Sequence, residues 1–260
     1  MAVLSWVNYL SVVVGVTNFF NLIIITTIVL RRNPKEKINW LFAMSFFFIA
    51  VAYVFLPIGA FVYTEENPDT MLLLTKIYGL CLFIGLVLLM LSSVAFNYGS
   101  KFVMKWFILI PSIIVIVGIA LLLFALNDTE GIWYAMKASG GETANIETSL
   151  AFTLIFYPIC GILAIIIYVF FSRAYKQTND KNIRRSLAYF IIGLSVSLSM
   201  LIPNILSNVL ADIWENAQIL NGLEFILVAI GVTLMLVGFL VKSRSVTLEQ
   251  IAYEVPITVG

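Results

Sequence analysis

Residues 6–30 read WVNYLSVVVGVTNFFNLIIITTIVL, and residues 31–37 follow them as RRNPKEK. The first stretch is long enough to cross a bilayer as a helix, because a spanning helix needs about 20 mainly apolar residues. It is too long for the core of a signal peptide, and no basic residue precedes it, so we expect a retained anchor. An apolar run that ends in a basic loop is the pattern that decides the fold.

Six more apolar stretches follow the first, separated by linkers that are polar, charged or rich in Pro and Gly. The sequence therefore predicts an all-α membrane protein, a bundle of seven transmembrane helices in one domain over residues 1–244. Residues 245–260 form a short tail that is expected in the cytoplasm. The predicted spans are residues 6–30, 38–63, 71–96, 106–126, 149–171, 186–210 and 217–241.

The basic residues indicate the direction of the spans, because cytoplasmic loops carry an excess of Lys and Arg. All of them except Lys76 and Lys137 lie in the loops after the first, third and fifth spans or in the tail. Most acidic residues fall in the opposite loops. We therefore expect a multi-pass protein of the plasma membrane, with the N-terminus outside and the C-terminus in the cytoplasm.

Composition excludes several classes of function. The chain has 62% hydrophobic and 11% charged residues and no histidine, whereas soluble domains carry about 25% charged residues. The absence of histidine removes histidine-ligated metals, catalytic triads and histidine proton relays, and we expect Cys81 and Cys160 to be buried apolar residues. The seventh span has no lysine for a retinal Schiff base. We expect no enzyme activity, no metal or cofactor and no nucleic-acid partner.

Two ionisable residues lie inside the predicted spans, where such residues are expensive and often functional. Lys76 is one to two turns from the outer end of the third span, and Glu224 is about two turns into the seventh. Their shared depth suggests an ion pair between these two helices. The alternatives are that Lys76 extends to the interface and that Glu224 is protonated.

Other polar residues fall at a similar depth near the predicted outer face. Together with Lys76 and Glu224 they would line a small pocket that opens outward and binds a ligand, or they would only hold helices together by hydrogen bonds. The sequence leaves both interpretations open. These residues are Tyr53, Tyr157, Asn204, Asn208 and Asn221.

Helix packing is the expected role of a second polar set. Asn18 and Asn21 share one face of the first span, and Ser195 and Ser199 belong to a run of small residues in the sixth. Small residues let membrane helices approach closely.

The outer loop at residues 127–148 is long and contains Gly131-Ile-Trp-Tyr and Gly140-Gly141. A loop of this length is either a lid or binding element or an unstructured surface segment.

Several short motifs resemble a known family. They are Arg31-Arg32 after the first span, Phe96-Asn97-Tyr98-Gly99 before Lys101, Gly131-Ile-Trp-Tyr in the outer loop, and Arg184-Arg185-Ser-Leu leading to Leu201-Ile-Pro-Asn204. Over residues 5–244 the chain resembles the N-terminal seven-helix sensor region of prokaryotic histidine kinases and diguanylate cyclases. The resemblance implies a sensor that passes an outside or membrane signal inward through the last helix. An output domain normally follows that helix in the family, whereas residues 245–260 are too few for one.

Three functions fit these observations. The first is a receptor-like sensor that signals to a separate cytoplasmic or membrane partner. The second is a structural or assembly protein that forms oligomers in the membrane, and the third is a small-solute transporter, which has few charges at mid-membrane for coupling. The expected partners are the lipid bilayer and either further copies of the chain or a separate signalling protein.

Overall fold

A computed structural model describes most of the chain. The described residues are 6–32, 34–62, 68–124, 136–139, 145–148, 150–203, 206 and 218–240. Within them, seven helices are long and apolar enough to cross a membrane. The predicted all-α bundle of seven spanning helices is confirmed, and the chain is a multi-pass membrane protein.

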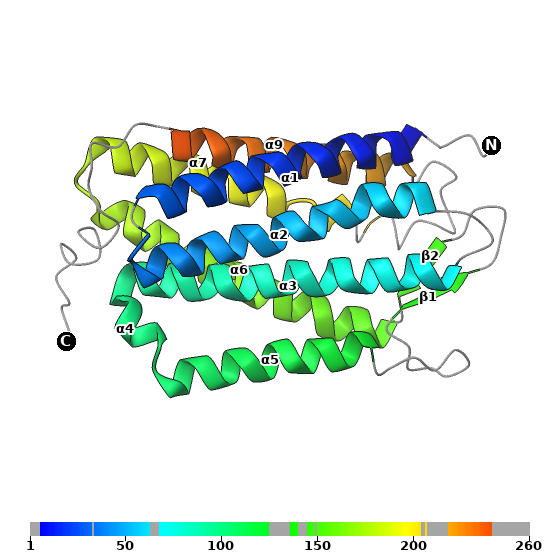
Figure 1. Cartoon of the computed structure of the whole chain (residues 1–260), viewed down its shortest axis with the longest axis horizontal. Helices are drawn as coiled ribbons and strands as arrows, with labels where there is room; N and C mark the ends of the chain where they lie inside the picture. Colours follow the sequence, from blue (N-terminus) through cyan, green and yellow to red (C-terminus); the bar gives the residue numbers. More distant parts are fainter. Residues whose placement is uncertain are drawn as a thin grey trace.

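Successive spanning helices run in opposite directions (Figure 1). Five helices follow the predicted spans within a few residues. The bounds are α1 Trp6–Arg32, α2 Lys37–Val62, α3 Pro68–Tyr98, α5 Trp106–Phe124, α6 Leu150–Gln177, α7 Lys181–Leu198 and α9 Gln218–Leu240, with a short helix α4 at Ser100–Val103 between α3 and α5.

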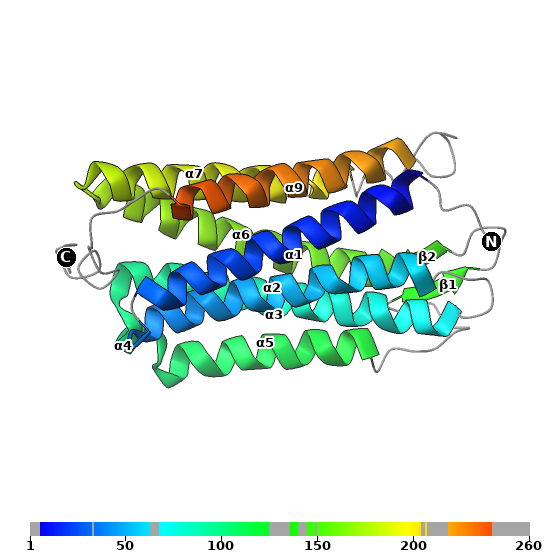
Figure 2. The same cartoon turned by 45° about the horizontal axis from the view of Figure 1, so that its top comes forward.

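Six of the helices form a closed ring. Each packs against the next in the order α1, α2, α3, α6, α7, α9 and back to α1. The seventh, α5, lies outside this ring and packs mainly against α3, at the edge of the bundle in Figures 1 and 2. The ring has an interior shared by six helices, and α5 leaves most of its apolar surface toward the membrane.

The bundle has two chemically different ends. At one end, the hairpin end, α1 and α9 begin and a small antiparallel hairpin of β1 (Met136–Ser139) and β2 (Asn145–Thr148) packs near α3. The sequence did not indicate these strands, and the rest of the predicted long loop lies outside the described residues. At the other end, the basic end, the loops after α1 and α3 and the junction of α6 with α7 carry most of the described Lys and Arg residues.

The sixth span begins earlier than predicted, at Lys181 and not at Ser186. The Asp180 side chain caps this helix by accepting hydrogen bonds from the backbone N–H groups of Asn182 (2.7 Å) and Ile183 (3.2 Å). Such a cap satisfies donors that the first helical turn leaves open. The helix therefore extends past the apolar run into a charged segment that hydropathy assigns to a loop.

Aromatic rings fill the ring interior near the basic end. Phe42 is at the centre, with ring centroids of Phe46, Phe96, Phe171, Phe190 and Phe239 at 5.0 to 5.9 Å. These six residues, the phenylalanine plug, come from α2, α3, α6, α7 and α9. All six are at most 9% exposed, so closely packed aromatic rings occupy this part of the interior.

Backbone contact joins α7 to α9. A Cβ atom placed on Gly193 would lie 2.5 Å from the Gly231 carbonyl oxygen, and one on Gly231 would lie equally close to the Gly193 carbonyl oxygen. The Ser186 hydroxyl also donates to the Gly238 carbonyl oxygen (2.5 Å). Because only glycine leaves room for this approach, the two helices form one tightly packed pair.

Candidate functional site

Four polar side chains from four helices of the ring meet in its hairpin half. They are Tyr53 of α2, Tyr78 of α3, Tyr157 of α6 and Glu224 of α9, the tyrosine–glutamate cluster. The Glu224 carboxylate interacts electrostatically with all three tyrosine hydroxyls, and Tyr78 also interacts with Tyr53 and Tyr157. The Tyr53 and Tyr78 rings lie edge to face with centroids 6.3 Å apart.

The cluster lies below the surface of the bundle but away from its middle. Glu224 is about 9 Å along α9 from Gln218, and Tyr157 is about 10 Å along α6 from Leu150, at about 1.5 Å per residue. Tyr53 is 4% exposed, whereas Tyr78, Tyr157 and Glu224 are half-buried. This depth corresponds to one leaflet of the membrane.

Local sequence explains how Tyr53 reaches the interior. Asn39, Phe42, Phe46, Ala50 and Tyr53 are all buried and follow one another at intervals of three or four residues. That interval places them on one face of α2. The same face thus carries the centre of the phenylalanine plug toward the basic end and a polar tyrosine toward the hairpin end.

A carboxylate at this depth is costly unless polar groups surround it. Phenol groups can donate hydrogen bonds to a carboxylate and present apolar rings to the rest of the bundle. The cluster therefore suits a hydrogen-bonding or cationic ligand.

Lys76 is nearly fully buried, with 3% of its surface exposed. It lies two helical turns before Phe83, whose ring packs against Phe156 of α6 at 5.9 Å between centroids. Lys76 is therefore on the side of α3 that faces α6. Since α3 and α9 are not neighbours in the ring, an ion pair between Lys76 and Glu224 would have to cross the interior, and it stays a prediction.

The other predicted ligand-binding residues are described in part or not at all. Asn204 and Asn208 lie outside the described residues, as does the side chain of Asn221, which α9 carries one turn before Glu224. Tyr53, Tyr157 and Glu224 are brought together. Tyr78 was missed by sequence reasoning, although its type and depth are those of the two tyrosines that were selected.

The residues predicted for helix packing behave differently from one another. The Asn21 side-chain amide donates to the Thr233 hydroxyl (3.4 Å) and so joins α1 to α9. The Ser195 and Ser199 hydroxyls donate to carbonyl oxygens of their own helix. Asn18 is fully buried, and neither its amide nitrogen nor its amide oxygen has a hydrogen-bond partner.

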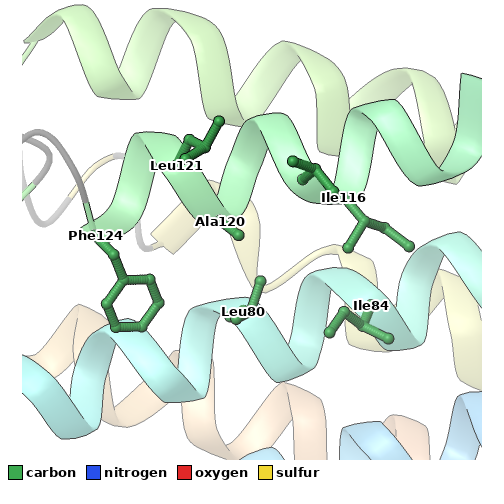
Figure 3. Close-up of a pocket in the computed structure, with 7 residues that line it drawn as sticks. Leu80, Ile84, Ile116, Ala120, Leu121 and Phe124 are labelled. Atoms are coloured by element: carbon green, nitrogen blue, oxygen red, sulfur yellow. The ribbon is translucent and has the colours of Figure 1, made fainter.

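An apolar groove lies elsewhere on the bundle, between α3 and α5. It has a volume of about 480 Å³, and Figure 3 shows Leu80 and Ile84 of α3 opposite Ile116, Ala120 and Phe124 of α5. Its lining is almost entirely apolar, so it lacks the polar groups that fix a ligand's orientation. The tyrosine–glutamate cluster is the better candidate site.

Among the residues that the structure describes, no three Cys, Asp or Glu residues are placed to hold a metal ion. No protein-family model matches the chain, and a comparison with curated proteins finds no significant match.

Proposed function

We propose that the protein is a receptor-like membrane sensor that binds its signal at the tyrosine–glutamate cluster and passes it to the basic end. The observation that carries this proposal is the contribution of one polar side chain from each of α2, α3, α6 and α9. A ligand bound among four helices alters the packing of all four. Ligand binding at the tyrosine–glutamate cluster thereby changes how the six helices of the ring pack against one another.

The last helix offers a direct route from this site to the basic end. Glu224 lies near the start of α9, and at the end of α9 the Phe239 carbonyl oxygen accepts a hydrogen bond from Arg32 of α1 (2.7 Å). The preceding carbonyl, that of Gly238, accepts from Ser186 of α7. A shift or rotation of α9 at the cluster would change both contacts at the far end.

The resemblance to sensor regions of histidine kinases and diguanylate cyclases supports the same direction of signalling, through the last helix. We propose that the hairpin end faces the outside of the cell and the basic end the cytoplasm, in agreement with the distribution of Lys and Arg. A separate signalling protein then receives the output at the basic end. On this proposal the chain carries out no catalysis itself.

The phenylalanine plug argues against the transporter alternative. A solute that entered at the hairpin end would meet six packed rings with centroids no more than 6.2 Å from their neighbours. A transporter would need a second packing of this region to open a route. A sensor needs only a closed base against which the ligand-binding half can move.

A structural role is the second candidate, and α5 favours it. This helix has the most hydrophobic span of the seven and the smallest buried share, with Ile114 and Leu121 at least 60% exposed. Such a surface fits contact with lipid or with another membrane protein. On that alternative, the cluster in the ring would serve only to hold the helices together.

Replacement of Glu224 by Gln tests the sensor proposal, because glutamine keeps the size of the side chain and removes its charge. Spin labels at cysteines introduced for Lys101 and Lys181, with Cys81 and Cys160 replaced by serine, would report distances across the basic end in lipid nanodiscs. We expect Glu224→Gln to change the distance distribution. An unaltered distribution, identical to that of Ile230→Val on the exposed side of α9, would overturn the proposal.

A further inference from the structure

The basic end carries a second cluster in which cations are held against aromatic rings. Arg173 of α6 donates from Nη1 to the Tyr98 hydroxyl (3.2 Å), and its guanidinium carbon lies 5.7 Å from the centre of the Tyr98 ring. Lys105 Nζ lies 5.4 Å from the centre of the Phe102 ring. The Tyr98 and Phe102 rings are themselves 5.1 Å apart. Tyr98, Phe102, Lys105 and Arg173 form the Tyr98 cluster.

The backbone fixes this cluster at the end of the spans. Tyr98 is the last residue of α3, and Gly99 follows with a φ of 84°, a conformation that glycine adopts without strain. The turn sends the chain into α4 and brings Phe102 back beside Tyr98, and Lys105 follows over the Phe102 ring. Cation–π contacts of this kind hold a positive side chain in place without neutralising it.

The positive charge of the cluster has no carboxylate to offset it on its own elements. Residues 70–124 and 150–179, which include α4, α5 and nearly all of α3 and α6, contain no Asp or Glu. Lys105 and Arg173 are both exposed. An anion at this position would therefore be attracted by two fixed cations.

The surroundings indicate an anion that also has an apolar part. Trp106, next to Lys105, is 74% exposed, and Phe107, Ile110 and Ile114 continue the exposed apolar face along α5 from Lys105 into the membrane. An exposed tryptophan at the end of a span marks the level of lipid headgroups. A soluble anion would use the cations alone and would leave this face unused.

We propose that the Tyr98 cluster binds the phosphate of an anionic phospholipid, with the acyl chains of that lipid lying along the exposed face of α5. The inference is independent of the sensor function, because it concerns the basic end of the bundle and the proposed signal site lies in the hairpin half. It also gives α5 a role, since the one spanning helix outside the ring would be held in place partly by lipid. Each cation near a charged headgroup contributes about fivefold in affinity.

Thermal unfolding of the full chain in a neutral detergent tests the proposal, with phosphatidylglycerol, phosphatidylcholine or inorganic phosphate added in separate arms. A ligand that binds the folded state raises the unfolding midpoint. We expect phosphatidylglycerol to raise it by about 3 °C or more beyond phosphatidylcholine. Lys105→Gln combined with Arg173→Gln should lose most of this gain.

Two controls separate a specific site from general attraction to the basic end. Lys181→Gln removes a charge of the same end outside the Tyr98 cluster and should keep the response to phosphatidylglycerol. The double variant Lys105→Arg, Arg173→Lys keeps both charges and should retain most of the response to phosphatidylglycerol. If the double glutamine variant does not fold, native mass spectrometry of Lys105→Gln should still show a loss of about fivefold in bound phosphatidylglycerol.

Three results would overturn the proposal. The first is an equal response to phosphatidylglycerol and phosphatidylcholine, and the second is a response that survives the loss of both cations. The third is an equal gain from inorganic phosphate alone, which would indicate an anion site without a lipid.

Discussion

At the scale of single residues, Asn18 stands out among the described residues because both polar atoms of its side chain are buried without a hydrogen bond. It lies on the buried face of α1 with Val14, Leu22 and Ile25, and neither atom of its amide is hydrogen-bonded. An amide buried in this way costs about 1–3 kcal/mol relative to one that is satisfied. Asn21, one turn later, has a partner in Thr233, so the two asparagines form a natural pair of test and control.

We expect Asn18→Leu to stabilise the protein, because leucine has a similar size and needs no hydrogen bond. The free energy of unfolding should rise by about 1 kcal/mol or more. Asn21→Leu should lower it by about 0.6 kcal/mol, the typical contribution of a hydrogen bond between membrane helices. Urea unfolding in mixed micelles measures both values. Destabilisation by Asn18→Leu would show that a partner satisfies the amide in the membrane.

The same scale shows what sequence reasoning could reach. Tyr53, Tyr157 and Glu224 were selected because counting residues from the ends of the spans gives the depth of each. The structure places both tyrosines within electrostatic range of Glu224, and a ligand pocket at this level stays a prediction. Tyr78 was not selected, because depth alone does not say which way a residue points around its helix.

At the scale of elements, the approach of α7 to α9 depends on glycine. The shortest contacts that a Cβ on Gly231 would make are with the Ser197 hydroxyl, the Gly193 carbonyl oxygen and the Ser197 nitrogen, and two of these three are backbone atoms. Backbone cannot move aside as a flexible side chain can. Gly118 of α5, in contrast, has nothing within 4 Å of such a Cβ.

Gly231→Ala should therefore push α7 away from α9 and lower the free energy of unfolding by about 1–3 kcal/mol, the usual cost of overpacking. Gly118→Ala should be neutral or stabilising by up to about 1 kcal/mol, because alanine favours the helix and meets no obstacle. Parallel denaturant titrations of the two variants make the comparison. Equal effects at both positions would contradict the close packing of α7 on α9.

The spans themselves were predictable, because each is a long apolar run between polar linkers. Their ends were less so. α7 begins at Lys181 because Asp180 caps it, and a hydropathy profile does not register a cap. The order of helices in the ring was also out of reach, because a membrane helix that is apolar on every side carries no pattern to say which side meets a neighbour.

At the scale of the whole molecule, the phenylalanine plug connects five helices through the aromatic side chain of Phe42. Phe42 contacts five other rings of the plug and is 2% exposed, whereas Phe20 of α1 is 58% exposed. Chemically identical substitutions at these two positions separate the contribution of the plug from that of contact with lipid.

Phe42→Ala should lower the free energy of unfolding by about 3–5 kcal/mol, because it leaves a cavity among rings that cannot collapse to fill it. Phe20→Ala should cost much less, since lipid can occupy the space. The unfolding midpoints of the two variants in nanodiscs measure both losses of stability. Similar losses for both variants would mean that the plug is not the centre of the packing.

The sensor proposal depends on one property of the whole molecule, namely that the hairpin end faces the outside of the cell. Single cysteines at Lys137 in the hairpin and at Lys101 in α4, with Cys81 and Cys160 replaced by serine, can be tested in intact cells with a thiol reagent that does not cross membranes. The account predicts that the cysteine at position 137 reacts in intact cells and that the one at position 101 reacts only after lysis. The reverse pattern would place the tyrosine–glutamate cluster in the inner leaflet and contradict the proposal.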